Sequence, residues 1–314
     1  MRGILIGWII KQTREEIGLT QEQLCEGICT PATLSRIENG KQAPSYNRMN
    51  ALLQRLGLPE NRYYALITQQ EMEIERLQKS IINYSIRYDR LEGEQKMQAR
   101  HRAQMLLIEL EGSMDKDDHI TRQFVLRTKA ILGREDDNYG LEEQREILFE
   151  AIRLTVPGFD EEEIGCKIYS LNELKIIIQI AVNYAESGQH KKAIDLLGQL
   201  LKYVKRHSHN DTQAARQTSH ITYNYALELA TVGRYSDAIE IAELGKQISV
   251  EHGYYHFLPG VAHIMAECHY RLGNNEEGRS FYYQAYYVYK LIDNERDRLA
   301  VRVDAKKFMN IEFS

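Results

Sequence analysis

Side chains that could bind another molecule are concentrated in residues 19–41, LTQEQLCEGICTPATLSRIENGK. A helix over the second half of this segment would turn Leu34 and Ile37 inward. Its outward side chains would be Ala32, Thr33, Ser35 and Arg36. A short helix with an exposed N-terminal half suits the major groove of DNA, where such groups can form hydrogen bonds. DNA is therefore the first partner to consider.

Two capped helices are expected to position these side chains. Thr20 is the predicted N-cap of the first helix, and Thr30 is the predicted N-cap of the second. Pro31 then occupies the first helical position, where its missing N–H does no harm. Gly27 lies where the chain needs an easy reversal or a close helix contact, and Gly40 is the expected helix stop.

Residues 4–66 resemble a helix-turn-helix domain of the phage repressor class, Cro/C1 or Xre. The agreement covers Ile6, Ile10, Arg14 and Ile17 of a first helix, then Leu19-Thr20-Gln21, Leu24-Cys25 and the run LSRIENGK at 34–41. After these helices we expect a fourth over residues 45–56 and a short fifth over residues 60–67. The resemblance also implies that Arg14 and Glu38 form a buried or half-buried salt bridge with a structural role.

The same resemblance assigns DNA-binding roles to individual residues. Gln21, at the start of its helix, would bind a phosphate together with backbone N–H groups. Arg36 would read guanine, because its planar fork can bond O6 and N7 together, and Thr33 would touch a thymine methyl group or a phosphate. Asn39 and Lys41 would hold the DNA backbone. The full predicted set is Gln21, Pro31, Ala32, Thr33, Ser35, Arg36, Asn39 and Lys41.

Pro31 and Ala32 depart from the family pattern, because longer polar residues are often found at these base-reading positions. We therefore expect little direct base readout there and a contribution from DNA shape. The alternative is that the helix-turn-helix fold is kept only as an interaction module that does not bind DNA.

The charge of the chain is divided unevenly. The whole chain has a formal net charge of −5, but residues 1–66 carry eight basic and six acidic side chains, which leaves −7 for the remainder. A charge of +2 is a weak attraction for DNA, so a monomer should bind poorly, and dimerisation would double the contacts. The two parts of the chain are expected to have different functions.

Several classes of function lack a signal. The four cysteines are too few and too scattered for a disulfide framework, which indicates a cytoplasmic protein, and Cys25 and Cys29 lack the second pair of a zinc site. None of the ten histidines has a recognised ligand or catalytic spacing, and no phosphate loop, nucleophile elbow or HExxH sequence occurs. We expect no enzyme activity, no metal, no cofactor and no membrane span.

A single amphipathic helix is predicted over residues 69–91. Its apolar stripe has seven-residue spacing with Gln70 as the one polar member, and consists of Ile67, Ile74, Leu77, Ile81, Tyr84, Tyr88 and Leu91. Two interpretations stay open. The stripe packs against the next domain, which we favour because three heptads are short for an independent coiled coil, or it pairs with its copy in a homodimer.

The rest of the chain indicates helix after helix, with an internal repeat. The same small, large, Gly, small, large spacing occurs three times, with periods of 45 and 40 residues, at Ala181, Tyr184, Gly188, Ala193 and Leu197, at Ala226, Leu229, Gly233, Ala238 and Ala242, and at Ala266, His269, Gly273, Gly278 and Tyr282. This pattern resembles the tetratricopeptide repeat, whose usual period of about 34 residues is shorter.

Stacked helical hairpins make a solenoid whose concave wall is lined by the first helix of each pair. On this register the wall carries Lys175, Gln179 and Asn183, then His220, Tyr223, Asn224 and Leu227, then His263, Glu267 and Arg271. Such a mixture suits an extended peptide, and Asn183 and Asn224 could hold its main chain, because an amide both donates and accepts hydrogen bonds. The alternative is that they are ordinary solvated or packing asparagines.

The expected architecture is all-α. It comprises a five-helix repressor-like DNA-binding domain (1–68), a linker helix (69–92) and a tetratricopeptide-like α-solenoid (93–314) that binds ligand and dimerises. This arrangement resembles the peptide-sensing regulators of Gram-positive bacteria, the Rgg, PlcR and PrgX group. The resemblance implies a cytoplasmic homodimer that binds double-stranded DNA at a palindromic operator and a short signalling peptide in its solenoid.

Other functions stay open at this stage. The solenoid could bind a protein partner instead of a peptide, or the chain could be a scaffold that does not bind DNA. The sequence does not determine whether DNA binding activates or represses, the operator, the target genes or the peptide.

Overall fold

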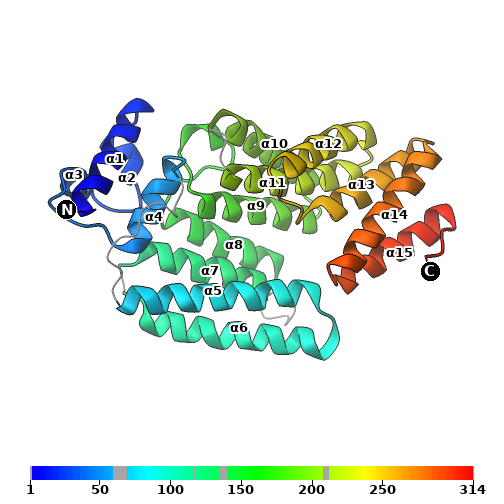
Figure 1. The fold of residues 1–314 in the computed structure, drawn as a ribbon, viewed down its shortest axis with the longest axis horizontal. Coiled ribbons are helices and arrows are strands. Elements are labelled where there is room, and N and C mark those ends of the chain that lie inside the picture. Colours follow the sequence, from blue (N-terminus) through cyan, green and yellow to red (C-terminus); the bar gives the residue numbers. More distant parts are fainter. Residues whose placement is uncertain (1, 59–68, 116, 134–139, 208–211, 314) are drawn as a thin grey trace. The chain divides into compact units, whose positions relative to one another are not determined.

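The computed structural model describes residues 2–58, 69–115, 117–133, 140–207 and 212–313. Over these ranges the regular structure is helical and contains no strand, which confirms the all-α prediction (Figure 1). No helix in the described part of the chain is long and apolar enough to cross a membrane. The α-helices are α1 (Arg2–Glu16), α2 (Gln21–Cys25), α3 (Pro31–Glu38), α4 (Tyr46–Arg55), α5 (Gln69–Arg90), α6 (Gly93–Ser113), α7 (His119–Leu132), α8 (Leu141–Arg153), α9 (Leu171–Glu186), α10 (His190–His207), α11 (Thr212–Thr231), α12 (Tyr235–Glu251), α13 (Leu258–Arg271), α14 (Asn275–Leu291) and α15 (Glu295–Met309).

The chain divides into two compact units, each built from two stretches of sequence. The first unit comprises Met1–Asn83 and His101–Asn183, and the second comprises Tyr84–Arg100 and Tyr184–Ser314. Helices α5, α6 and α9 therefore contribute residues to both units. The domain boundaries proposed from the sequence follow sequence patterns rather than packing, and they stay a prediction.

The first helices begin and end where their capping residues predict. The Thr20 hydroxyl accepts a hydrogen bond from the backbone N–H of Gln23, and the Gln23 side chain accepts one from the N–H of Thr20, which completes a capping box on α2. Thr30 caps α3, and Ser45 caps α4. Gly40, with φ of +67°, follows α3 in the left-handed conformation that ends many helices.

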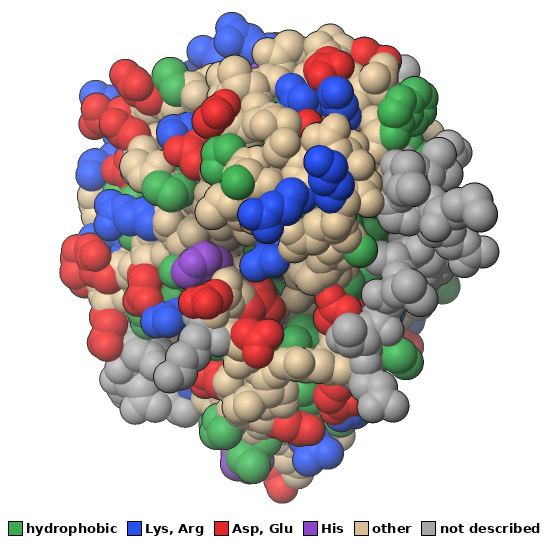
Figure 2. Space-filling model, turned by 90° about the vertical axis from the view of Figure 1, so that its left-hand side faces the viewer, with side chains coloured by type: hydrophobic (Ala, Val, Ile, Leu, Met, Phe, Trp, Pro, Cys, Tyr) green, Lys and Arg blue, Asp and Glu red, His purple; other side chains and the backbone are tan. Residues whose placement is uncertain are grey.

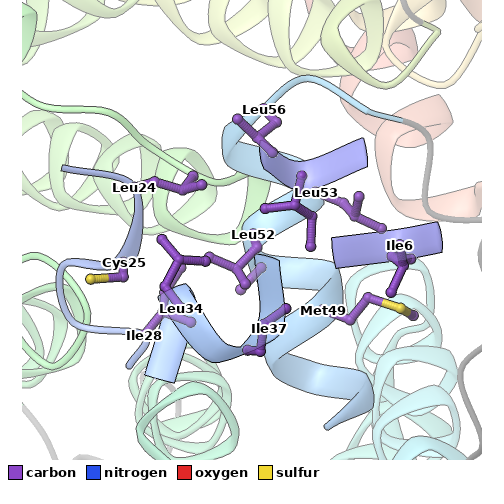
Figure 3. Packing of buried hydrophobic residues seen from close by; sticks show 12 residues of the cluster. Ile6, Leu24, Cys25, Ile28, Leu34, Ile37, Met49, Leu52, Leu53 and Leu56 are labelled. Atoms are coloured by element: carbon purple, nitrogen blue, oxygen red, sulfur yellow. The ribbon is translucent and has the colours of Figure 1, made fainter. Parts of the chain in front are cut away.

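Helices α1–α4 share one apolar cluster (Figure 3). Leu24 comes from α2, Leu34 and Ile37 come from α3, and Leu52 comes from α4; all four side chains are fully buried. Since α2 and α3 are too short to be stable alone, this shared packing holds them in place. The predicted fifth helix, residues 60–67, lies outside the described residues.

Gly27 lies in the turn between α2 and α3 and also contacts a later part of the first unit. Its φ of +71° is in the left-handed region that favours glycine. A Cβ atom at this position would lie 1.9 Å from the carbonyl oxygen of Thr155, which follows α8. Both roles considered for Gly27, the reversal and the close contact, therefore occur at one residue.

The apolar stripe of α5 is covered within a single chain. Ile74, Leu77 and Ile81 are buried in the first unit. The one polar member, Gln70, donates a hydrogen bond to the carbonyl oxygen of Ser113 at 3.0 Å. A dimer seam through these three apolar residues would need them to be exposed in the monomer, so the burial supports the packing interpretation.

The predicted repeats are helical hairpins. Gly188, Gly233 and Gly273 lie between the paired helices α9 and α10, α11 and α12, and α13 and α14, each with positive φ. The small residues beside these turns are buried and allow the helices to approach closely. At Gly278, for example, a Cβ atom would lie 3.1 Å from the carbonyl oxygen of Ala266 on the facing helix. The tetratricopeptide-like prediction is confirmed.

Replacing Gly27 by alanine should destabilise the first unit by about 3 kcal/mol, because the left-handed backbone and the overlap with Thr155 both add to the cost. Gly57→Ala is the matched control, since Gly57 has φ of +67° but no atom within 4 Å of an added Cβ. Its expected loss is about 1–2 kcal/mol. Urea unfolding of both variants measures the difference, and equal losses would show that the contact with Thr155 is unimportant.

Candidate functional site

Helix α3 presents the outward face that the sequence predicts. Pro31, Ala32 and Arg36 are exposed, and Thr33 and Ser35 are half-buried. The Thr33 hydroxyl lies 3.0 Å from that of Thr30, so the first turn of α3 is held together by its own polar side chains. The exposed face is therefore fixed by the cap and by the apolar cluster below it.

The polar residues around the end of α3 differ in whether their side chains are already hydrogen-bonded within the protein. The Arg36 side chain is exposed and makes no hydrogen bond or ion pair with the described residues, so its guanidinium group is available to a partner. The Asn39 side chain donates to the carbonyl oxygen of Ser35 at 2.7 Å, which caps α3. Lys41 is exposed, and its backbone N–H bonds back to the carbonyl oxygen of Arg36 at 2.8 Å.

The predicted pair of Arg14 and Glu38 is confirmed as a buried salt bridge between α1 and α3. Nε of Arg14 donates to Oε1 of Glu38 at 2.6 Å, and Nη2 donates to Oε2 at 3.1 Å. This hydrogen-bonded contact raises the pKa of Arg14 above its ordinary value. Arg14 also donates to the carbonyl oxygen of Leu19 at 2.9 Å, which fixes the entry to α2.

Gln21 joins this pair rather than pointing freely outward. Its side-chain amide donates to Oε2 of Glu38 at 2.6 Å, and the residue is half-buried. A phosphate at the start of α2 would thus meet a side chain that is already held by α3. Phosphate binding by Gln21 stays a prediction.

The surface around these helices has mixed charge. Figure 2 views the molecule from the side on which α1 and α3 lie in Figure 1, and it shows lysine and arginine side chains interspersed with acidic ones. This agrees with the small positive charge of residues 1–66. Long-range attraction to DNA would therefore be modest, and close contacts would have to supply much of the affinity.

The predicted peptide-binding residues divide between the two units, with Lys175, Gln179 and Asn183 in the first. Lys175 and Gln179 are half-buried on α9. The prediction for Asn183 needs correction, because this side chain is buried and its amide is fully used inside the protein. It donates to Leu141 and Gln144 at 2.8 Å and accepts from Arg145 at 3.2 Å, which ties α9 to α8. Asn183 is a packing residue.

On α11 the predicted residues form an aromatic cluster with a residue that the sequence did not single out. The rings of His220 and Tyr223 both stack on Phe257, with centroids 4.7 Å and 5.3 Å away. Burial raises the pKa of the Tyr223 hydroxyl to about 12. Asn224 donates to the carbonyl oxygen of His220 on its own helix at 2.9 Å, and Leu227 is exposed. Phe257 falls between two repeats, so the repeat pattern could not identify it.

On α13 two of the predicted wall residues, His263 and Arg271, contact another helix, α15. His263 lies 3.0 Å from the carboxylate of Asp304, and Arg271 lies over the ring of Phe308 at 4.8 Å. Glu267 accepts a hydrogen bond from Arg271 at 3.1 Å. The assignment of His263 to an open peptide wall needs correction, since this half-buried imidazole is paired with Asp304 of α15. Arg271 stays exposed, and its contact with a peptide stays a prediction.

The buried cysteines behave as small apolar residues. Burial raises the pKa of the Cys25 thiol to about 11 and that of Cys268 to about 12. Thiols with such pKa values hold little reactive thiolate at neutral pH. Cys25 instead fills a place in the cluster shared by α1–α4.

Comparison with protein families identifies both halves of this arrangement. Residues 10–62 match the Helix-turn-helix family model, and residues 160–306 match the model of the RNPP family C-terminal domain. The chain is a helix-turn-helix protein with an RNPP family C-terminal domain. A search of curated protein sequences found no significant match to this chain.

Solved structures share the fold of this RNPP-type chain over nearly its whole length. Bacillus thuringiensis PlcR in complex with the peptide PapR7 and DNA is 22% identical, with a TM-score of 0.60 over 94% of this chain and 98% of that chain. ComR from S. thermophilus in complex with DNA and its signalling peptide ComS is 17% identical, with a TM-score of 0.51 over 95% of this chain and 98% of that chain. At these identities the likeness shows a common fold.

The Arg14–Glu38 pair should be essential to the stability of the helix-turn-helix domain. Glu38→Ala leaves a buried arginine without its acid, so we expect a loss of about 3–5 kcal/mol in the free energy of unfolding. Glu15→Ala removes the exposed second carboxylate beside Arg14 and should cost under about 0.5 kcal/mol. Denaturant unfolding followed by circular dichroism tests this, and similar losses in the two variants would contradict the structural role.

Proposed function

We propose that this protein is a sequence-specific DNA-binding transcriptional regulator whose RNPP-type domain binds a short signalling peptide that controls DNA binding, as in quorum sensing. The observation that carries the proposal is the open face of α3, where the Arg36 side chain has no partner among the described residues, in a chain whose residues 160–306 match the RNPP family C-terminal domain. The DNA and peptide found with PlcR and with ComR support both partners.

The geometry of α3 supports binding in the major groove. Arg36 would bond guanine O6 and N7 together, while Thr33 would contact a thymine methyl group or a phosphate. Pro31 and Ala32 are exposed and short, so they would read shape and apolar contacts more than hydrogen-bonding groups. Ser35, Asn39 and Lys41 would help hold the DNA backbone, with Gln21 at the start of α2.

A homodimer on a palindromic operator is part of the proposal. One head with a small positive charge makes few phosphate contacts, and two heads on one operator double them. Cytoplasmic localisation follows from DNA as the partner, and the four free cysteines support a reducing compartment. We propose no enzymatic activity and no cofactor, since the chemistry needed is binding alone.

For the peptide, the surface of α11 in the second unit is the best supported. The side-chain carbonyl oxygen of Asn224 has no partner among the described residues, so it could accept a hydrogen bond from a peptide N–H. Leu227 lies one turn further and is exposed, which suits an apolar peptide side chain. Lys175, Gln179, Glu267 and Arg271 stay in the candidate set. A peptide would control DNA binding only through a different affinity for two arrangements of the protein.

Arg36→Ala should weaken binding by about 5–150-fold to a duplex that the parent protein selects from a random pool, and it should relax base preference at one position. Arg234→Ala is the control, because this exposed arginine lies on the second unit beside Asp237 and should leave DNA affinity unchanged. Fluorescence anisotropy at two salt concentrations measures both variants. Binding that does not depend on salt or on Arg36 would refute the DNA-binding proposal.

The two asparagines should respond differently to alanine substitution. Asn183→Ala should lower the free energy of unfolding by about 1–3 kcal/mol, because it leaves buried hydrogen-bonding groups unpaired. Asn224→Ala should preserve stability but remove the rise in melting temperature that binding members of a synthetic short-peptide library give the parent. If no library member changes the melting temperature or the DNA affinity of the parent, the peptide-sensing proposal fails.

A further inference from the structure

The head, defined here as residues 2–58 with helices α1–α4, is attached to a support formed by α7, α8 and the segment up to the first turn of α9. Both belong to the first unit. Lys167 of the support pairs with Glu26 of the head at 2.8 Å. The Asn47 side chain donates to the Thr121 hydroxyl at 3.0 Å, and Ile120 packs against the apolar cluster of the head.

The most buried link is the side chain of Arg55, the last residue of α4. Nη1 of Arg55 donates to the carbonyl oxygens of Leu24 and Glu26, at 3.0 Å and 2.6 Å, both at the end of α2. Nη2 donates to the carbonyl oxygen of Thr155 and to the carboxylate of Glu173, at 3.0 Å and 2.9 Å, both in the support. One planar guanidinium group thus joins the helix-turn-helix to the support. Arginine suits this position because its two terminal nitrogens can donate hydrogen bonds in different directions at once.

Glu173 is itself held in position. Its carboxylate accepts a hydrogen bond from the backbone N–H of Ser170 at 2.5 Å, and its own N–H donates to the Ser170 hydroxyl at 3.4 Å. This capping box at the start of α9 holds the Glu173 carboxylate in position independently of Arg55. The side chains of Arg55 and Glu173 are each 2% exposed, so separating head from support would leave two buried charges uncompensated or newly hydrated.

The attachment leaves the proposed reading face uncovered. Arg55, Glu26 and Asn47 lie on α4 and at the end of α2, whereas Ala32 and Arg36 of α3 remain exposed. The support therefore holds the head without covering the residues that would read DNA. A contact of this kind sets orientation rather than blocking access.

We propose that Arg55 is a positioning residue that fixes the direction of the recognition helix by locking the head to α7–α9, so that head and support move as one rigid body. This inference rests on the proposed function, because orientation matters only if two heads must meet two half-sites. Two rigidly held heads would bind a correctly spaced operator tightly and reject other spacings. With loosely held heads, the second head would have a lower effective concentration at its half-site on a correctly spaced operator, so binding there would weaken. Such heads would also tolerate operators with other spacings.

Two variants of the full-length chain loosen the link. Glu173→Gln removes the charge and keeps an amide oxygen for the cap at Ser170. The double variant Arg55→Met with Glu173→Met removes both buried charges, which proteins often tolerate better than the loss of one partner. Lys167→Gln is the matched control at the same contact, because its pair with Glu26 is partly exposed and should contribute little. Circular dichroism and thermal unfolding establish that each variant is folded.

DNA affinity is measured on duplexes with two half-sites, with one half-site, and with half-sites moved apart by single base pairs, all derived from the sequence that the parent selects. We expect the two loosened variants to lose about tenfold on the correctly spaced duplex and to stay within about twofold of the parent on one half-site. They should also discriminate less between spacings. Damage to the helix-turn-helix itself would instead also weaken binding to the duplex with one half-site.

Trp8 gives a second readout that needs no DNA. It is the only tryptophan of the chain, lies on α1 of the head and is 56% exposed. In the parent and in Lys167→Gln, its slow fluorescence anisotropy decay should report tumbling with the support. In the loosened variants a faster component from independent motion of the head should appear.

The outcomes separate the two proposals. Unchanged Trp8 anisotropy in both loosened variants would overturn the positioning role of Arg55, whatever the DNA data show. Tighter DNA binding by these variants would also overturn it, since that result means the support inhibits the head. If Trp8 shows a freed head but the parent binds no DNA selectively, the rigid link stands and the proposed regulatory function fails.

Discussion

The buried pair of Arg14 and Glu38 is the interaction on which the geometry of the proposed DNA-reading face depends. It joins α1 to the last turn of α3 and recruits Gln21 from α2, so three short helices share one charged centre. None of these helices would keep its direction alone, because each is short and marginally stable in water. The apolar cluster of Leu34 and Ile37 supplies the burial, and the ion pair selects one arrangement of the helices within it.

A second buried arginine extends the same logic beyond the helix-turn-helix. Arg55 satisfies carbonyl groups at the end of α2 and also meets Glu173 at the start of α9, so the turn that positions α3 is shared between head and support. Gly27 permits this contact by bringing its backbone against Thr155. The proposed DNA-reading surface is consequently exposed but not independent of the support, which is what a regulator needs if events in its helical repeats are to influence DNA binding.

Features set by local chemistry could be predicted from the sequence, and features set by contacts between distant segments could not. Thr20, Thr30 and Gly40 act on their own helices, and the repeat glycines act on their own turns, so each was identified correctly. Asn183 and His263, like Asn224, lie on the first helices of the repeats, but Asn183 is held by Arg145 and His263 by Asp304 of α15. The register gives the face of a helix, whereas its neighbours decide whether that face is open. Arg55 carried no local signal, because its partners in the support, Thr155 and Glu173, lie 100 and 118 residues away.

The most direct test is to let the full-length protein select duplexes from a random-sequence pool at physiological salt. A regulator that places two copies of α3 in successive major grooves should enrich a two-fold symmetric sequence with a conserved guanine in each half-site, contacted by Arg36. Substitution of that guanine should weaken binding in both halves equally. Recovery of no enriched sequence, or of one whose binding does not depend on symmetry, would contradict the proposal that this chain is a dimeric, sequence-specific DNA-binding protein.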